Sequence, residues 1–423
     1  MRQYDLAVIG GGFAGVGAAL AAAAQGLRTI IVERGNCFGG AAVTALVNPF
    51  MPFSTATGTD PAGNKVWKKL SDGIFGQIYT GLREMGALHD NQITFDEEAL
   101  KLLLNRMLTK ANVDILFHSY LVGAAINNNV VENVTVANKS GNMVLAADYF
   151  VDATGDADLA ALCKCPFRLG RAKDNLCQPM TLCFRLANVN MDAYKKSAPT
   201  ITPLYQKLQQ EGKIKNIRED VLIFSSLTEG VLHFNSTRVV KKNPIDAYDI
   251  TAAEIEAREQ VFELHAFLKE HIDGFEASKL IMTAPQIGVR ESRKIDGEYV
   301  LTEQDLVNCV KFDDAIAAGN YDIDIHNPEG SGTSHYYFPD GEYYTIPYRS
   351  LIPKGVNNLL VAGRCISATH EAQASIRIMP IVCCLGEAAG TAVAVAHQAS
   401  VPVNRVDVTR IQDILKANGA FIG

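Results

Sequence analysis

The 423-residue sequence lacks the features that would place it in a membrane or on nucleic acid. Its longest apolar stretches are residues 16–24 and the segment after Pro380, which Glu387 and His397 interrupt, so we expect no membrane span. Positive charge is also in deficit, since 39 Lys and Arg stand against 46 Asp and Glu, a net charge of −7. A surface of that sign repels phosphate backbones, so we expect no nucleic-acid partner.

Proline, glycine and cysteine are too scarce for a fibrous, disordered or disulfide-stapled chain. There are 15 prolines, 34 glycines and 9 cysteines, and the cysteines are spread along the chain. Cys163, Cys165, Cys177 and Cys183 lie near one another but form no C-x-x-C pair, so we expect no metal site. The first residues lead into a strand without a leader-like segment. These features favour a cytoplasmic protein.

The first forty residues have the pattern of a strand, a tight turn, a helix and a second strand. Residues 6–9 form an apolar run typical of a buried parallel strand. The segment Gly10–Gly15 follows with the spacing G-x-G-x-x-G, and an alanine-rich helix is predicted over residues 16–25. Residues 28–33 read as the second strand. This β-α-β pattern predicts a dinucleotide-binding turn.

Each glycine of this motif has a physical task. Gly10 permits the tight turn, Gly12 lets the backbone approach a pyrophosphate, and Gly15 lets the helix pack closely on the strand. The helix N-terminus offers free N–H groups and a positive dipole end to the phosphates. Glu33, at the end of the second strand, can accept hydrogen bonds from ribose hydroxyls. The motif alone leaves FAD and NAD open.

Two later segments favour FAD. Residues 152–156, Asp-Ala-Thr-Gly-Asp, follow a series of short β-like runs, where a plain NAD-binding domain would alternate strands and helices. A buried strand at residues 358–364 then precedes a helix from about 381 to 397. We therefore expect a β-meander before the second half of the cofactor site. Its predicted runs are residues 115–117, 121–126, 130–136, 143–146 and 149–151.

Together these motifs resemble the bacterial FAD-dependent oxidoreductase family, among the two-dinucleotide-binding-domain flavoproteins of glutathione-reductase and succinate-dehydrogenase type. The resemblance extends over nearly the whole chain. It implies FAD as cofactor and an α/β fold: a split Rossmann-like FAD-binding domain with a β-meander, and an inserted α+β cap. Besides the N-terminal fingerprint and residues 152–156, it is carried by residues 38–40, 178–182, 288–293, 346–349 and 361–380.

The resemblance also implies which residues hold FAD. Arg34 and Gly40 would line the adenosine and pyrophosphate, and Arg364 would meet the pyrophosphate and the ribityl chain. Pro380 would occupy the first position of a helix whose N-terminus stabilises negative charge on the flavin. The full set of candidates is Gly10, Gly12, Ala14, Gly15, Glu33, Arg34, Gly39, Gly40, Val122, Ala153, Thr154, Gly155, Gly363, Arg364 and Pro380.

The middle of the chain does not continue the nucleotide-binding pattern, and it holds no second G-x-G-x-x-G. We therefore predict an FAD-binding domain in two parts, residues 1–158 and 350–423, with a substrate cap at residues 159–349. Within the cap, Thr251–Glu254 reads as a capping box that opens a helix running to about His271. The active site is expected between the cap and the flavin.

Four residues are candidates for catalysis. Arg290, Arg293 and Arg377 can each clamp a carboxylate in bidentate geometry. The alternative for each arginine is an internal ion pair, for example with Glu291. His370 is placed to move a proton near the flavin, although histidines with a purely structural role are more common.

The sequence thus predicts an enzyme, an FAD-dependent oxidoreductase that transfers a hydride between its flavin and a small organic substrate with an anionic group such as a carboxylate. It implies an electron donor or acceptor that the sequence does not identify, and it leaves the oligomeric state open. Two alternatives also stay open at this point. One is an NAD-dependent dehydrogenase that uses the N-terminal motif alone, and the other is a flavin-carrying redox sensor or assembly subunit without turnover.

Overall fold

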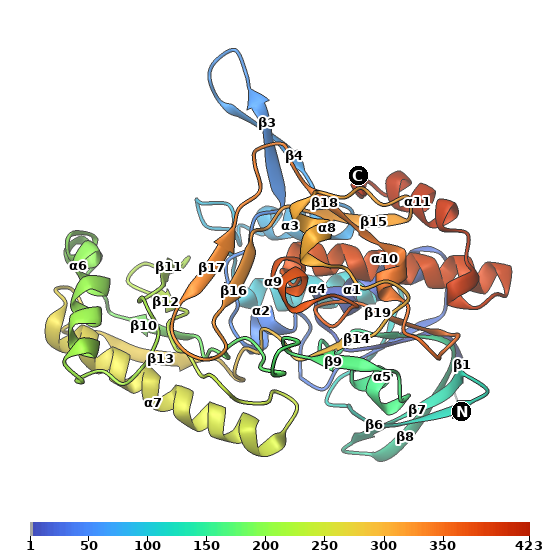
Figure 1. Cartoon of the computed structure of the whole chain (residues 1–423), viewed down its shortest axis with the longest axis horizontal. Coiled ribbons are helices and arrows are strands. Elements are labelled where there is room, and N and C mark those ends of the chain that lie inside the picture. Colours follow the sequence, from blue (N-terminus) through green and yellow to red (C-terminus); the bar gives the residue numbers. More distant parts are fainter. Residues whose placement is uncertain (1–2) are drawn as a thin grey trace.

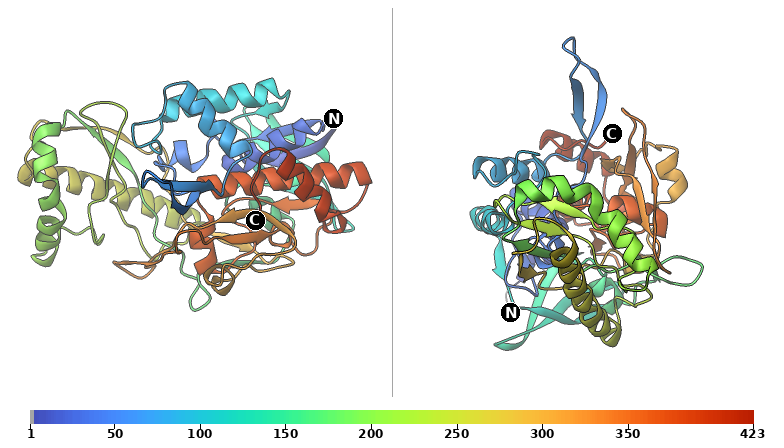
Figure 2. Two further views of the ribbon diagram at one scale, coloured as in Figure 1. Left: turned by 90° about the horizontal axis from the view of Figure 1, so that it is seen from above. Right: turned by 90° about the vertical axis from the view of Figure 1, so that its left-hand side faces the viewer.

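The computed structural model of the chain describes residues 3–423, so the first two residues, on which the expectation of no leader partly rests, lie outside the described part. The chain forms two regions (Figure 1). The larger one is built on a seven-stranded sheet, and the smaller one, the cap, lies at one end of the long axis. Figure 2 shows from two further sides that the cap stands beside the larger region.

The seven-stranded sheet takes strands from both ends of the chain. Its strands are β1 (Gln3–Ile9), β2 (Thr29–Val32), β5 (Asp114–Leu116), β6 (Tyr120–Asn127), β7 (Val130–Asn138), β8 (Gly141–Asp152) and β19 (Leu359–Val361). Their order is β5-β2-β1-β8-β7-β6, and β19 pairs with β8. The pairs β5–β2, β2–β1, β1–β8 and β8–β19 are parallel. The predicted α/β fold with a split Rossmann-like part is confirmed.

β8 joins the parallel part of the sheet to the β-meander. The sequence predicts two short runs here, residues 143–146 and 149–151, but the structure has one strand of 12 residues. Its first half pairs antiparallel with β7, and its second half pairs parallel with β1 and β19. One long strand therefore belongs to both the parallel part of the sheet and the β-meander. The Asp-Ala-Thr-Gly turn follows at its carboxyl end.

Two helices from opposite ends of the chain pack against each other beneath this sheet. They are α1 (Phe13–Ala24) and α10 (Met379–Ala399), and small residues let their backbones approach. A Cβ atom on Gly386 would lie 1.9 Å from the carbonyl oxygen of Ala14, and one on Gly390 would lie 2.1 Å from that of Ala18. α10 is long and apolar enough to cross a membrane, but its residues 379–396 are buried inside the fold.

The cap is a four-stranded antiparallel sheet with two long helices. Its strands are β10 (Phe184–Ala187), β11 (Ile223–Ser225), β12 (Leu232–Phe234) and β13 (Lys279–Thr283), in the order β11-β12-β10-β13. Its helices are α6 (Met191–Gln210) and α7 (Ala247–His271). Apart from Leu46, the buried cluster of the cap runs from Met180 to Ile287, whereas residues 301–352 contribute to the core of the larger region. The domain limits at residues 158 and 349 stay a prediction.

α7 begins four residues before the predicted capping box. Asp246 is its N-cap, because its carboxylate accepts hydrogen bonds from the backbone N–H groups of Tyr248 and Asp249. Thr251 instead donates its hydroxyl to Ala247 O one turn earlier, and Glu254 accepts from the backbone N–H of Ile287. The capping-box pattern was therefore wrong about the start of the helix, although the predicted end at His271 is confirmed.

The remaining elements complete the larger region and its surface. A hairpin of β3 (Ser54–Thr59) and β4 (Lys65–Lys69) projects from it, as Figures 1 and 2 show. Three further two-stranded pairs are β9 (Phe167–Leu169) with β14 (Arg293–Ile295), β15 (Ala315–Gly319) with β18 (Tyr344–Pro347), and β16 (Ile323–His326) with β17 (Thr333–Tyr336). The other helices are α2 (Ala41–Thr44), α3 (Ile74–Glu84), α4 (Glu97–Lys110), α5 (Asp158–Leu162), α8 (Glu303–Val307), α9 (His370–Ile376) and α11 (Val408–Ala417), with 3₁₀ turns η1 (Tyr348–Leu351) and η2 (Val403–Arg405).

Candidate active site

A long groove runs along the carboxyl ends of the parallel strands and has a volume of about 210 Å³. This is where ligands bind in open parallel α/β sheets. Its walls come from the turns after β1, β2, β8 and β19, from the start of α10, and from residues 286–289 beside the cap. Thus the two ends of the chain and the cap meet at one site.

The glycines of the fingerprint meet the requirements that the sequence suggested. A Cβ atom on Gly10 would lie 2.4 Å from Ala153 O, and one on Gly15 would lie 1.8 Å from Gly10 O. Gly12 differs, because the nearest atom to a Cβ there would be Gly40 Cα at 3.8 Å. Gly10 and Gly15 therefore allow the chain to fold closely, whereas Gly12 leaves open space in the groove beside the N-terminus of α1.

Glu33 lies at the end of the groove formed by β2. Its side chain is held by two backbone N–H groups, from Gly11 to Oε2 at 2.6 Å and from Gly35 to Oε1 at 2.7 Å. These bonds fix the carboxylate and leave lone pairs for ribose hydroxyls. The adjacent Arg34 donates to the side-chain oxygen of Gln286 at 3.1 Å, which links this end of the groove to the cap side.

An ion pair between Arg364 and Asp156 lies in the middle of the groove. Asp156 Oδ1 also accepts from the Ser292 hydroxyl at 2.6 Å. Burial raises the pKa of Asp156, but the charge and hydrogen bond of Arg364 and the bond from Ser292 outweigh it, so the pKa is lowered and the carboxylate stays charged. The Nε atom of Arg364 is buried and has no partner among the described residues. This free donor, together with the cradle at Gly12, fits the pyrophosphate of FAD.

The other end of the groove is formed by the start of α10. Met379 and Val382 line it, and the N-cap residue Ile378 provides no side-chain acceptor for the first N–H groups of the helix. Pro380 is the second residue of α10 rather than the first, one position later than predicted, because the helix already begins at Met379. Arg377, just before α10, lines the groove and donates to the carbonyl oxygens of Ala374 and Asp324.

Behind Arg377 lies a buried network centred on Asp324 and His326. Arg238 donates to His326 Nδ1 at 2.9 Å, and because guanidinium groups only donate, Nδ1 is an acceptor. Nε2 then carries the proton and faces Asp324 Oδ2 at 3.3 Å. Burial lowers the pKa of His326 to about 3, so the ring is neutral. Burial raises the pKa of Asp324, but its bond to His326 and the charges of Arg377 and Arg290 lower it well below its usual range.

The structure places three of the four predicted catalytic residues away from the groove lining. Arg290 is buried against Pro179 O and the side chains of Thr181 and Asn235. Burial, and then the charge of Arg377, lowers the pKa of Arg290 to about 9.

Arg293 and His370 have internal carboxylate partners. Arg293 pairs with Asp158 at 2.8 Å and lies over the ring of Phe167. His370 Nδ1 lies 2.7 Å from Glu291, which also pairs with Lys294. These are the internal pairings that the sequence left open as the alternative.

Most of the predicted cofactor-binding residues line the groove. They are Gly10, Gly12, Ala14, Glu33, Arg34, Gly39, Gly40, Ala153, Thr154, Gly155, Gly363 and Arg364. Gly15 and Pro380 lie behind the lining, within α1 and α10. Val122 in β6 is 46% exposed, and the neighbouring Leu121 lines the groove, since side chains alternate along a strand. The role of Val122 in cofactor binding stays a prediction.

Sequence reasoning missed several residues of the groove. Asp156 is the last residue of the motif at residues 152–156. Its carboxylate could have been predicted to pair with Arg364, which was already a candidate for the same site. Gln286 and Ile287 could not have been found, because they reach the groove only through the folding of the cap. Ser119 and Leu121 depend on the register of β6.

Several solved structures are similar to this chain, and one of them reaches a TM-score of 0.50. A geranylgeranyl bacteriochlorophyll reductase-like protein from Thermoplasma acidophilum is 13% identical, with a TM-score of 0.50 over 99% of this chain and 83% of its own. An aromatic hydroxylase from angucycline biosynthesis is 11% identical, with a TM-score of 0.49 over 100% of this chain and 68% of its own. The p-nitrophenol 4-monooxygenase of Pseudomonas putida is 11% identical, with a TM-score of 0.44 over 99% and 81%. At 13% identity the likeness to the reductase-like protein concerns the fold alone.

The sequence itself gives the family. A search of the curated proteins finds no significant match. The family model described as FAD dependent oxidoreductase matches residues 5–415, nearly the whole chain. With FAD as cofactor, the alternative of an NAD-dependent dehydrogenase is excluded. The chain belongs to the FAD dependent oxidoreductase family, so it is an enzyme with FAD as its cofactor.

Proposed function

We propose that the protein transfers a hydride between FAD held in the groove and a small organic acid whose carboxylate is bound by Arg377. The position of Arg377 carries the proposal. Of the four predicted catalytic residues, all of which are described, Arg377 alone lines the groove, at the end where α10 begins. A guanidinium group binds a carboxylate through two parallel hydrogen bonds.

The present partners of Arg377 leave it able to bind a substrate. Its contacts to Asp324 are 3.2 Å to the carbonyl oxygen and 3.4 Å to Oδ2, long for charge-assisted hydrogen bonds. The side chain of Arg377 is 13% exposed, so part of it faces the groove. Asp324 therefore orients the guanidinium group without saturating it.

The start of α10 supports the same location for the chemistry. FAD, when bound, supplies the atom that accepts or donates the hydride. The chain supplies the N-terminal N–H groups of α10, which have no side-chain cap and stabilise negative charge at this end of the groove. Ile287, Val289 and Met379 provide an apolar surface that excludes water from it.

The test is anaerobic mixing of the purified FAD-bound protein with a panel of carboxylic acids and their neutral analogues. We expect at least one acid to bleach the flavin absorption, and its amide or ester to fail. Arg377→Met should abolish the bleaching while FAD stays bound. Arg168→Met is the matched control, because Arg168 pairs with Asp296 on the surface. Bleaching by neutral compounds, with no effect of Arg377→Met, would remove the acid from the proposal.

The same experiment separates an enzyme from a non-catalytic flavoprotein. If dyes reduce the flavin rapidly and no metabolite of a broad panel does so, a redox sensor or assembly subunit is favoured. We also propose a cytoplasmic location, since all nine cysteines are unpaired in the described chain. The physiological electron donor or acceptor is proposed to be a separate molecule, to be identified by its rate of reaction with the reduced or oxidised protein.

A further inference from the structure

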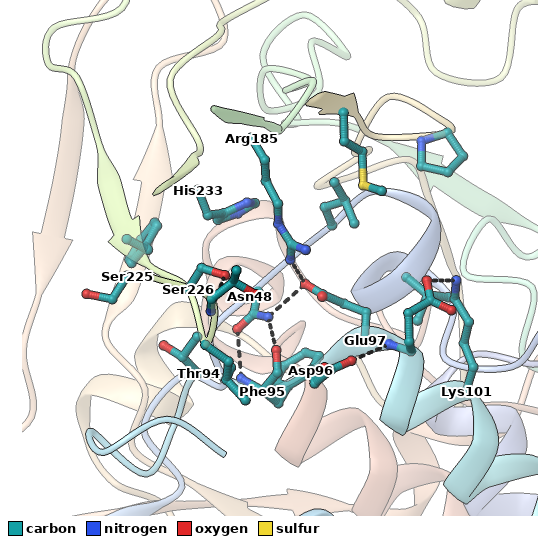
Figure 3. Close-up of a pocket in the computed structure, with 18 residues that line it drawn as sticks. Asn48, Thr94, Phe95, Asp96, Glu97, Lys101, Arg185, Ser225, Ser226 and His233 are labelled. Carbon is teal, nitrogen blue, oxygen red and sulfur yellow. Dashed lines mark hydrogen bonds and ion pairs between the residues drawn. The ribbon is translucent and has the colours of Figure 1, made fainter. Parts of the chain in front are cut away.

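A second cavity lies between the cap sheet and the larger region, on the far side of α2 from the groove. We call it the cap pocket; it has a volume of about 190 Å³. Its cap wall is one row of side chains across the sheet, Phe224, His233, Arg185 and Met282, each paired in register with the next. Asn48 and the start of α4 form the opposite wall (Figure 3).

A single layer of backbone separates the cap pocket from the groove. The N–H group of Gln286 donates to Thr44 O at 2.9 Å, and both of these residues line the groove. Their neighbours Pro285 and Val43 face the other way and line the cap pocket. The two cavities are therefore distinct sites that share one wall.

The charged groups of the cap pocket are already paired. Arg185 forms an ion pair with Glu97, and Lys101 pairs with Glu98 at 2.6 Å. Asp96 caps α4 through the N–H groups of residues 98 and 99. The side-chain amide of Asn48 donates both of its hydrogens, one to Phe95 O at 2.7 Å and one to Glu97 Oε1 at 2.8 Å. Figure 3 shows this paired wall as a chain of dashed lines.

His233 differs from these residues because its side-chain polar atoms are unpaired in the described part of the chain. It is 2% exposed, and neither of its ring nitrogens has a partner among the described residues. The Nε atom of the neighbouring Arg185 is also buried without one. Buried polar groups of native proteins nearly always have partners. Burial, and then the charge of Arg185, lowers the pKa of His233 to about 3, so the ring is neutral, with one donor and one acceptor nitrogen.

These groups select the charge and polarity of a ligand. A carboxylate can only accept, and it would lie beside Glu97; an ammonium group can only donate, and it would face Arg185. A hydroxyl group can donate to the acceptor nitrogen of His233 and accept from Arg185 Nε, once these covered atoms turn toward the cavity. The rest of the lining includes apolar side chains, among them Leu46, Met282 and Pro285. For scale, a cavity of roughly 150 Å³ holds benzene.

We propose that the cap pocket binds a small uncharged ring compound that carries a hydroxyl group, through His233 and Arg185. This site is separate from the cofactor groove and from the proposed substrate position at Arg377. It does not depend on the proposed hydride transfer.

The test is calorimetric titration of the FAD-bound protein with phenol and cyclohexanol, beside benzoate and benzylamine as charged probes. We expect one hydroxyl compound per chain, and no binding of the charged probes at the same concentrations. The ring ¹⁵N signals of His233 should shift on binding, and the flavin absorption should not change.

His233→Phe should weaken binding about tenfold, equal to about 1.4 kcal/mol. Arg185→Lys, which keeps the charge beside Glu97 but removes Nε, carries the same expectation if the first variant fails to fold. His271→Phe, at the exposed end of α7, is the matched control and should bind as the original protein does. Absence of phenol and cyclohexanol binding overturns the proposal. So does tighter binding of benzoate or benzylamine, or binding that shifts the flavin absorption and persists in His233→Phe.

Discussion

The groove and the cap pocket are built in different ways from the same chain. The groove is formed by turns at strand ends, and its charged side chains are fixed: Glu33 by two backbone N–H groups, and Asp156 by Arg364 and Ser292. The cap pocket is formed by side chains on the face of a sheet, and His233 has no partner there. The first is a rigid backbone cradle, whereas the second gains hydrogen bonds when a ligand enters.

The largest effect is expected where two backbones touch beneath the groove. In Gly15→Ala the new methyl group would lie 1.8 Å from Gly10 O, so α1 must move away from β1. We expect a loss of more than about 3 kcal/mol in the free energy of unfolding, together with loss of FAD. Urea denaturation and flavin absorption measure both. Gly123→Ala in β6, where the nearest atom would be 3.6 Å away, is the control and should change stability little. Equal stability of the two variants would contradict the close packing.

A smaller effect is expected from Glu387, a buried carboxyl group of α10. Burial raises its pKa to about 7, from 4.5, against one hydrogen bond from Ile74 N. Because the folded state holds the proton more tightly, stability is full below pH 4.5 and falls as the pH rises to 7, by about 3 kcal/mol. Glu387→Gln should remove this fall. Chemical denaturation of both proteins from pH 4.5 to 8 tests it, and parallel pH profiles would contradict it.

His233 should give the opposite pH dependence, with a smaller effect in the accessible range. Its pKa is lowered from 6.5 to about 3, so the unfolded chain binds the proton more tightly. Stability is full above pH 6.5 and falls by about 2 kcal/mol at pH 5. His233→Phe should remove the loss of stability between pH 6.5 and pH 5. It should leave the pH dependence of the free energy of unfolding between pH 7 and 8 unchanged. If the variant lost as much stability between pH 6.5 and pH 5 as the original protein, the ring of His233 would already be solvated or paired.

The sequence predicted the groove well because its construction is local. Glycine spacing, an acidic strand end and a second buried strand identify a backbone cradle without knowledge of the rest of the fold. The sequence placed a second buried strand at one cofactor site with the first motif, whereas its pairing with β8 is seen only in the structure. The one error seen here was a one-residue shift at Pro380, which depends on where α10 begins.

The cap could not be predicted in the same way, because it depends on register between distant strands. Arg185, His233 and Met282 come together only when β10, β12 and β13 pair, and no pattern in the sequence links them. The same reason explains the catalytic candidates. Arg290 and Arg293 lie close in sequence to groove residues, but the folding of the chain after Val289 directs both to internal partners.

The most direct test of the account is titration of the cofactor-free protein and of Gly12→Ala with FAD. A Cβ atom on Gly12 meets nothing closer than 3.8 Å in the protein, so the variant should fold with unchanged stability. The added methyl group occupies the space where the pyrophosphate must approach the N-terminus of α1. We predict one tightly bound FAD per chain for the original protein and at least about tenfold weaker binding for the variant. Equal FAD affinity in the two proteins would contradict the placement of the cofactor in this groove.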